Sequence, residues 1–208
     1  FNIAKEFDDK LKISKYVNNI GIWYWKDFDY SKAIDYYEQS LTIKEELGDT
    51  RNYGKTLNNL GEVYYDMGDF NSAIDQFNQS IGIKEKLNDQ KGLNSTLFNL
   101  GEAQIYNSNY ADALLNFRRA LLIANTLKDE NQISRSYKEI GIIHYNLAAY
   151  DSATYYLNKS DSIYMHSPVN RLTTLSWLAV TAMKAGSQSQ AQNYFQSFNE
   201  LIDQHDPN

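Results

Sequence analysis

The stretch NLGEVYYDMGDFNSAIDQF, residues 59–77, decides the fold, because its pattern returns along the chain every 40 residues. In each copy an alanine follows a glycine by twelve residues, and a large apolar residue follows that alanine by four. The four clear copies are Gly21, Ala33 and Tyr37; Gly61, Ala73 and Phe77; Gly101, Ala113 and Phe117; and Gly141, Ala153 and Leu157. A weaker fifth copy keeps Ala179, Ala191 and Phe195. Self-similarity at a fixed period is typical of proteins built from stacked structural repeats.

Each copy predicts two helices. Apolar residues recur at spacings of three and four, as in Leu57, Leu60 and Tyr64, which is the periodicity of an amphipathic helix. Aspartates stand at the expected start of four first helices, namely Asp9, Asp49, Asp89 and Asp129. An aspartate there accepts hydrogen bonds from free backbone N–H groups, and Ser167 before Pro168 is expected to do so in the fifth copy. The predicted helix pairs span about 10–26 with 30–47, 50–67 with 70–87, 90–107 with 110–127, 130–147 with 150–166 and 168–185 with 187–204, and no strand is expected.

Composition excludes several classes of protein. The 208 residues contain no cysteine, which excludes a disulfide framework, a thiolate metal site and a cysteine nucleophile. The formal net charge of -6 is opposite in sign to that of a usual nucleic-acid-binding domain, so no nucleic-acid partner is expected. No apolar run is long enough to cross a membrane. We therefore expect a soluble domain without membrane insertion, in the cytoplasm or the periplasm.

The spacing of Leu-Gly, an aromatic residue three positions later, and the alanine and Phe or Tyr beyond them resembles the tetratricopeptide repeat (TPR) over essentially the whole chain. The resemblance implies an all-α, right-handed α-solenoid of five helical hairpins plus a leading half-repeat. It also implies a single domain over 1–208, with repeats at about 10–48, 49–88, 89–128, 129–166 and 167–205. HEAT arrays, the competing solenoid with a period of about 40–47 residues, lack this glycine and alanine pair.

The period is longer than the roughly 34 residues of the usual TPR. The longer second helices end in Leu-Gly-Asp (47–49) or Leu-Asn-Asp (87–89) and are similar to those of kinesin light chains, Leu-Gly-Asn-type adaptors and bacterial peptide-sensing regulators. The many asparagines and tyrosines also resemble the TPR arrays of bacterial sensor histidine kinases.

Residues 1–9 match residues 41–49, 81–89 and 121–129, which are predicted to be the ends of second helices. We therefore expect 1–9 to be the end of an earlier repeat's second helix, packed on the helix at about 10–26 through Phe1, Ile3 and Phe7. Such a beginning implies a fragment of a longer protein, because this helix needs a partner to cover its apolar side. Any enzymatic domain of that protein, such as a histidine kinase, is expected outside these residues.

No catalytic constellation is present, so the chain is not predicted to be an enzyme, and neither a cofactor nor a metal ion is expected. His144 is expected to be half-buried between helices, whereas His166 and His205 fall near a helix end and the carboxy terminus. Residues 54–56, Gly-Lys-Thr, lack the glycine-rich loop and the strand of a phosphate-binding P-loop.

The resemblance implies that the first helix of each repeat lines a concave groove that binds a protein or peptide. Amides at these positions can hydrogen-bond to a peptide backbone, and aromatics supply buried contact area. The candidate groove residues are Asn18, Asn19, Trp25, Asn58, Asn59, Glu62, Tyr65, Asp66, Phe98, Asn99, Glu102, Tyr106, Arg135, Lys138 and Tyr145. The family's carboxylate clamp is not matched, because Glu62 would repel a carboxylate. Charged residues of the second helices, including Lys44 and Lys84, are expected on the solvated surface.

Two features of the expected groove are specific. Asn19, Asn59 and Asn99 recur at one repeat position, so they either form a ladder along a bound peptide or hydrogen-bond locally as part of the repeat. Acidic residues of the middle repeats, with Arg135 and Lys138 in the fourth, predict a groove that is negative in its middle and positive toward its carboxy-terminal repeats. That gradient would orient a peptide carboxylate toward the two basic residues.

The sequence thus predicts a non-catalytic protein- or peptide-binding module, the sensing or scaffolding part of a larger signalling protein such as a sensor histidine kinase or regulator. The alternative is a homo-oligomerisation module that uses its terminal helices.

Overall fold

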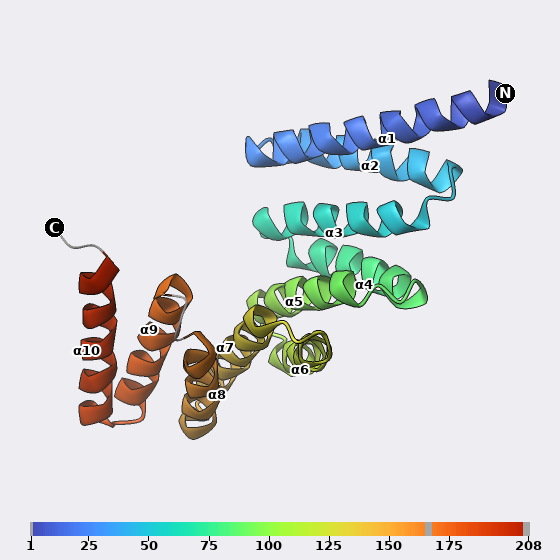
Figure 1. The fold of residues 1–208 in the computed structure, drawn as a ribbon. Coiled ribbons are helices and arrows are strands. Elements are labelled where there is room, and N and C mark those ends of the chain that lie inside the picture. The colour runs from blue at the N-terminus through green and yellow to red at the C-terminus, as the bar shows by residue number, and fades with distance from the viewer. Residues whose placement is uncertain (1, 165–167, 206–208) are drawn as a thin grey trace. The chain divides into compact units, whose positions relative to one another are not determined.

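The computed structural model describes residues 2–164 and 168–205, and within them the chain forms ten helices and no strand (Figure 1). The helices are α1 (Asn2–Lys26), α2 (Tyr30–Glu46), α3 (Thr50–Asp66), α4 (Phe70–Lys86), α5 (Gln90–Tyr106), α6 (Tyr110–Leu127), α7 (Glu130–Asn146), α8 (Tyr150–Ile163), α9 (Pro168–Lys184) and α10 (Gln188–His205). The all-α fold class and the helix pairs that the repeat predicts are confirmed, and apart from the start of α1 the helix ends lie within a few residues of the expected positions.

The helices belong to two compact units, Phe1–Ala113 and Leu114–Asn208, with the boundary inside α6. In the first unit α1 packs against α2 and α3 against α4, while α2 and α4 each pack on the first helix of the next pair. In the second unit α7 packs against α8, α8 against α9, and α9 against α10. Each unit therefore repeats one motif, a helical hairpin stacked on the next hairpin. A single domain over 1–208 stays a prediction.

The repeat glycines lie where the two helices of a hairpin touch. A Cβ atom on Gly61 would lie 2.6 Å from the Phe77 ring, and one on Gly141 would lie 2.8 Å from the Leu157 side chain. Ala73, four residues before Phe77, is fully buried. The large apolar residue thus fills the space beside the glycine, and close packing of these two positions explains why they recur together in the sequence.

Short turns join the helices, and most of them pass through one residue in the left-handed region of backbone conformation. Gly48 and Gly68 have φ of 65° and 79°, values at which glycine has no steric penalty. Phe28 and Ala148 adopt φ of 61° and 56° at the equivalent point of their turns, where a Cβ atom is unfavourable. The turn geometry is therefore set by the packing of the helices and not by glycine alone.

Aspartates cap the helices at three of the four expected positions. Asp49, Asp89 and Asp129 accept hydrogen bonds from the backbone N–H three residues later, at the starts of α3, α5 and α7. Asp29 and Asp69 do the same for the second helices α2 and α4. First and second helices of the repeat are thus capped in the same way, each by its own aspartate.

The beginning of the chain differs from the expectation. Helix α1 runs from Asn2 to Lys26 without a break, so Asp9 lies inside a helix instead of capping one, and residues 2–9 extend α1 instead of ending a separate helix packed on it. In the continuous helix the backbone N–H and C=O groups around Asp9 are paired within α1, whereas a turn at this point would give up some of these hydrogen bonds. The side chains of Phe1, Ile3 and Phe7, and the expected cap Ser167, lie outside the described residues.

Candidate functional site

Two neighbouring cavities lie along α1, α3 and α5 in the first unit. The first, called the lysine cavity, has a volume of about 280 Å³ and is lined by Lys15, Asn18, Asn19, Lys44, Asn52, Lys55, Thr56, Asn58, Asn59 and Lys84. The second, called the acidic pocket, has a volume of about 170 Å³ and is lined by Trp25, Glu62, Tyr65, Asp66, Phe77, Asn99 and Glu102. Ten of the fifteen candidate groove residues line one cavity or the other, so the first unit brings most of them together.

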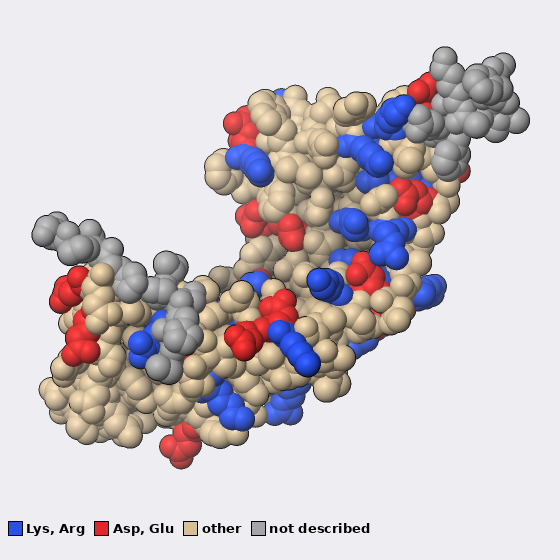
Figure 2. All heavy atoms as spheres, viewed as in Figure 1, with Lys and Arg blue, Asp and Glu red and all other residues tan. Residues whose placement is uncertain are grey.

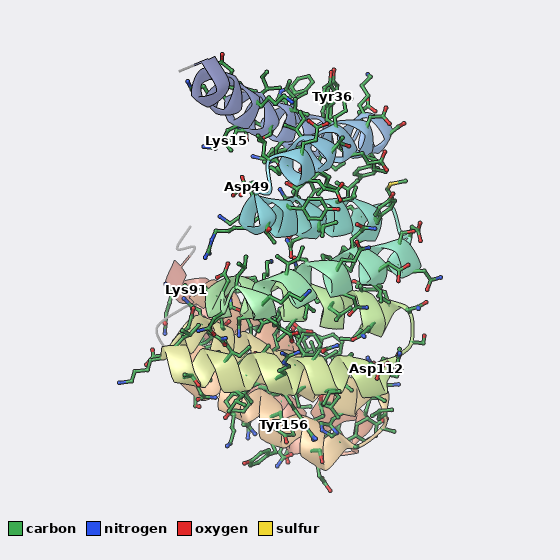
Figure 3. All side chains as sticks on the ribbon, turned by 90° about the vertical axis from the view of Figure 1, so that its right-hand side faces the viewer. Lys15, Tyr36, Asp49, Lys91, Asp112 and Tyr156 are labelled. Carbon is green, nitrogen blue, oxygen red and sulfur yellow. The ribbon has the colours of Figure 1, made fainter. Side chains whose placement is uncertain are left out.

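The two cavities lie on one face of the first unit and differ in charge. Figure 2 shows Lys and Arg side chains gathered over the right-hand halves of α1 and α3, where α3 begins, with some acidic side chains among them, and further acidic side chains over the left-hand end of α3. In Figure 3, Lys15 and Lys91 extend from α1 and α5 on one side of the unit, and Tyr36 of α2 extends on the opposite side. First helices of the first unit therefore contribute side chains to this face, and its role as a peptide-binding groove stays a prediction.

Two hydrogen-bonded groups of the same composition, one 40 residues after the other, form the base of the lysine cavity. In the first group the Asn18 side-chain oxygen accepts hydrogen bonds from the Lys44 ammonium at 3.2 Å and from the Thr56 hydroxyl at 2.8 Å. Lys44 also donates to the Thr56 hydroxyl oxygen. The corresponding bonds of the second group join Lys84 to Thr96 and Thr96 to Asn58. Each group connects both helices of one repeat to the first helix of the next.

Burial changes the proton affinity of the two lysines in these groups. Lys44 is 3% exposed and Lys84 is 6% exposed. Burial lowers the pKa of Lys44 to about 8. The negative charge of Asp49 opposes this shift, and the positive charge of Lys55 adds to it. Burial lowers the pKa of Lys84 to about 8 as well. The charges of Asp89 and Glu62 oppose this shift, and Lys55 adds to it. The expectation that Lys44 and Lys84 lie on the solvated surface is therefore wrong, because their side chains fill the junction between successive repeats.

The acidic pocket is held by contacts between successive first helices. The Trp25 indole N–H donates to the Asp66 carboxylate at 2.7 Å, which ties α1 to α3. The Glu62 carboxylate accepts hydrogen bonds from the side-chain amides of Asn58 and Asn99, both at 2.8 Å. Burial raises the pKa of Glu62, and these two amides oppose the shift because they stabilise the ionised form.

A cluster of aromatic rings lies beside the acidic pocket at the end of α5, and Tyr65 is the member of this cluster that lines the pocket. The Tyr106 ring is 63% exposed, and its centroid lies 5.5 Å from that of Tyr65 and 5.2 Å from that of Phe70. The contact with Tyr65 is edge-on, whereas the contact with Phe70 is stacked. An exposed aromatic ring beside carboxylates is a suitable surface for a cationic side chain.

The asparagine ladder divides into two kinds of residue. Asn99 donates to Glu62 of the preceding repeat, so this amide has a local structural partner. Asn19 and Asn59 line the lysine cavity, where a bound group could reach them. The ladder as a peptide-binding feature stays a prediction for these two positions.

The placement of Phe98 in the groove is wrong. Its side chain is 1% exposed and belongs to the core. Phe98 stands in the repeat position of Asn18 and Asn58, and Ala124 stands in the position of the two buried lysines. The next repeat thus replaces two of the three polar members of the group by apolar residues and keeps a hydroxyl in Ser136. Phe98 is buried because an apolar side chain has no cost of desolvation there.

Three candidate groove residues lie on α7 in the second unit. Lys138 forms an ion pair with Glu139 at 3.2 Å, and the Tyr145 ring packs edge-on against Trp177 at a centroid distance of 5.4 Å. Arg135 is half-buried on the same helix. The positive charge that was expected in the later repeats is thus partly neutralised by Glu139. A larger group of lysines lies in the first unit, for which the sequence predicted no positive charge.

The two hydrogen-bonded groups of asparagine, lysine and threonine correspond to a pattern that is visible in the sequence. Asn18 is followed by a lysine after 26 residues and by a threonine after 38, and Asn58 is followed in the same way. A polar pattern that recurs with the repeat period indicates a buried contact between repeats, since a solvated face carries no such constraint.

The described residues carry no sign of metal or membrane chemistry. His144 is half-buried, as predicted, and stacks on the Tyr156 ring at a centroid distance of 5.3 Å. Burial lowers the pKa of this imidazole. No three His, Cys, Asp or Glu side chains in the described chain are grouped so that they could hold a metal ion. None of the described helices has the length and apolar character needed to span a membrane.

Comparison with known families and structures agrees with this architecture. The tetratricopeptide repeat family model matches residues 4–86. No curated protein matches the sequence significantly. The chain is similar to the crystal structure of BtubC from P. vanneervenii, with 15% identity, a TM-score of 0.85, and coverage of 97% of this chain and 89% of that one.

Two Rap proteins have the same fold. The apo form of RapI is 21% identical with a TM-score of 0.87, covering 93% of this chain and 72% of that one. The Rap conjugation gene regulator of plasmid pLS20, solved in complex with the Phr* peptide, is 18% identical with a TM-score of 0.70, covering 97% of this chain and 56% of that one. At these identities the likeness shows a shared fold of stacked helical hairpins.

Proposed function

We propose that this chain, of which residues 4–86 match the tetratricopeptide repeat family model, is a repeat protein whose first unit binds an extended segment of a partner protein across the lysine cavity and the acidic pocket. The observation that carries this proposal is that two cavities of opposite charge adjoin on one face of α3. They meet where Asn58, which lines the lysine cavity, donates to Glu62, which lines the acidic pocket. The binding is non-catalytic.

The dimensions of this face suit a short peptide segment. Lys55 and Asp66 are eleven residues apart in α3, which corresponds to about 16 Å along the helix axis. An extended peptide advances about 3.3 Å per residue, so roughly five residues span both cavities. A basic side chain of the segment would lie between the carboxylates and Tyr106. The Rap regulator solved with the Phr* peptide supports the proposal, because a protein of the same fold has a peptide ligand.

A peptide selection tests the proposal. A random peptide library is selected on the immobilised chain, and the dissociation constants of enriched peptides are measured by isothermal titration calorimetry. The double variant Asp66→Asn with Glu102→Gln should bind these peptides roughly tenfold or more weakly, a loss of at least about 1.4 kcal/mol. Asp75→Asn is the matched control, because Asp75 is exposed on α4 and lines neither cavity. Equal affinities for the double variant and the wild type would overturn the proposal.

A second candidate function is self-association through α1. Ile13, Tyr16, Ile20 and Trp23 form an exposed apolar stripe on this helix, at spacings of three and four, and Tyr16 and Trp23 are 65% and 60% exposed. An apolar stripe on a terminal helix is a surface that a second copy could cover. Static light scattering at increasing concentration should then show a dimer that Tyr16→Glu with Trp23→Glu returns to monomer. A monomer at all concentrations would contradict this function.

We also propose that the chain is the sensing or scaffolding part of a larger signalling protein, such as a sensor histidine kinase or regulator. The Rap conjugation gene regulator of plasmid pLS20, which has the same fold, supports this context. Identification of the neighbouring domains in the full-length protein tests it, and a parent without a signalling or regulatory domain would contradict it.

A further inference from the structure

The lysine cavity has a second property beyond its place in a peptide-binding face. We propose that it is an anion site that holds one oxyanionic group, a carboxylate or a phosphoryl group, between the side chains of Lys15, Lys55 and the two buried lysines. The anion site depends on the proposed peptide-binding function in one respect only, the source of the anion. That source would be an acidic or phosphorylated side chain of the partner segment.

The residues that line the cavity have the composition of an anion site. Four of the ten are lysines, five are asparagines and one is a threonine, so all of them can donate hydrogen bonds, and none is an aspartate or glutamate. Lys15 and Lys55 occupy the same position in successive repeats and are exposed, whereas Lys44 and Lys84 are buried below them. The cavity therefore has positive charge on its exposed side, from Lys15 and Lys55, and on its buried side, from Lys44 and Lys84.

These lysines lack the partners that normally compensate a buried positive charge. The structure gives none of the four a carboxylate within ion-pair distance among the residues it describes, and the hydrogen bonds of Lys44 and Lys84 go to amide and hydroxyl oxygens. A buried charge without a carboxylate in direct contact is costly, and the neutral acceptors together with the more distant Asp49, Asp89 and Glu62 offset only part of that cost. An oxyanion in the cavity would supply the missing charge through charge-assisted hydrogen bonds.

The electrostatic environment agrees with this geometry. Lys55 lowers the pKa of both Lys44 and Lys84, so its charge acts on both buried ammonium groups, whereas Asp49 acts in the opposite direction on Lys44, and Asp89 and Glu62 do so on Lys84. A bound anion would reverse this repulsion and favour the charged form of each lysine. A cavity of about 280 Å³ has room for such a group together with part of the chain that carries it.

The alternative is that the lysines serve only to join the repeats. In that case the lysine side chains only fill the junction between the repeats, and the cavity contains water. Phosphate or a carboxylate would then change the Tm no more than chloride does at equal ionic strength. The two cases differ in a measurable way, because Lys15 and Lys55 do not take part in the hydrogen-bonded groups that join the repeats.

The experiment uses inorganic phosphate and N-acetyl-hexaglutamate as probes, each compared with sodium chloride at the same ionic strength and at pH 7. Thermal unfolding followed by circular dichroism should show a higher Tm with either probe than with chloride. In the double variant Lys15→Gln with Lys55→Gln the half-saturating concentration of the probe should rise roughly fivefold or more, because two charge-assisted contacts are lost. Lys86→Gln is the matched control, since Lys86 is exposed on α4 near Lys84 but does not line the cavity.

The outcomes separate this inference from the proposed function. If phosphate and hexaglutamate act only as chloride does, or if the double variant and the wild type respond alike, the anion site is overturned, whatever peptides the library selection yields. If the probes bind through Lys15 and Lys55 while the library yields no peptide, the anion site stands and the proposed peptide function fails. When peptides are found, replacing their acidic residues by amides or by phosphoserine identifies the source of the anion, and no change in affinity on amide replacement would exclude a carboxylate.

Discussion

The side-chain amide of Asn58 donates to the carboxylate of Glu62 at 2.8 Å, one turn further along α3. The Asn58 side-chain oxygen accepts from Thr96 at 2.7 Å, and Asn99 donates to the same Glu62 oxygen. One amide thus connects the lysine cavity to the acidic pocket and one repeat to the next. Asn58 therefore has both a structural role and a proposed binding role. The effect of its replacement on the free energy of unfolding has to be measured before any effect on binding is interpreted.

Asn58→Ala should lower the free energy of unfolding by about 1–3 kcal/mol, because Thr96, Asn99 and Glu62 lose a hydrogen-bond partner in a largely buried place. Urea unfolding followed by circular dichroism measures the change. Asn78→Ala is the control, since Asn78 is exposed on α4, and it should stay within about 0.5 kcal/mol of the wild type. A loss that is equal in the two variants would contradict the structural role of Asn58.

Gly61→Ala should destabilise the chain by about 1–3 kcal/mol, because the new Cβ atom would lie 2.6 Å from the buried Phe77 ring. Gly82→Ala provides the opposite case within the same unit. Its new Cβ atom meets no other group within 4 Å, and Gly82 lies inside α4, so the substitution should stabilise by up to about 1 kcal/mol. Changes of the same sign in both variants would be inconsistent with the packing described for the repeat glycine.

Ala148→Gly should stabilise the chain by up to about 1–2 kcal/mol, since residue 148 has a φ of 56° and glycine adopts this conformation without the steric cost of a Cβ atom. The same substitution at Ala111, an exposed residue within α6, should instead cost up to about 1 kcal/mol. Thermal unfolding of both variants distinguishes the two effects. A lower Tm for Ala148→Gly would show that the methyl group makes a contact worth more than the backbone strain.

The buried Lys44 should make stability depend on pH. Its pKa is lowered from 10.5 to about 8 in the folded chain, so between these values the unfolded chain binds more protons and the free energy of unfolding rises with pH. Below pH 8 the cost of burying the charge is fully present. Lys44→Met removes this cost, so its stability relative to the wild type should be greatest at pH 7 and should fall toward pH 9.5.

The matched control for this pH dependence is Lys86→Met, because Lys86 is exposed on the same kind of helix. Its stability relative to the wild type should not change between pH 7 and pH 9.5. Taking differences between variants removes contributions that all of them share, including Tyr37 and Tyr65, whose pKa values burial raises. A constant difference for Lys44→Met as well would contradict a lowered pKa for Lys44.

The sequence allowed the helices to be located because the determinants of each helical hairpin are local or separated by a fixed distance. Gly61 and Phe77 are sixteen residues apart, and the short turn between their helices brings them into contact in every hairpin. Asp49 caps α3 through a bond to the backbone three residues later. The sequence does not predict the continuous α1, because an aspartate such as Asp9 can either cap a helix or lie inside one, and the local residues do not distinguish the two cases.

The sequence by itself determined the hairpins, their period, the capping aspartates and the placement of the candidate amides on the first helices. The tertiary structure alone decided which charged side chains are buried: Lys44 and Lys84 look like surface lysines in a single helix, but the stacking of the next repeat covers them. It also decided that Phe98 belongs to the core. The physical reason is that burial is a property of contacts between repeats, whereas helical periodicity describes only one helix at a time.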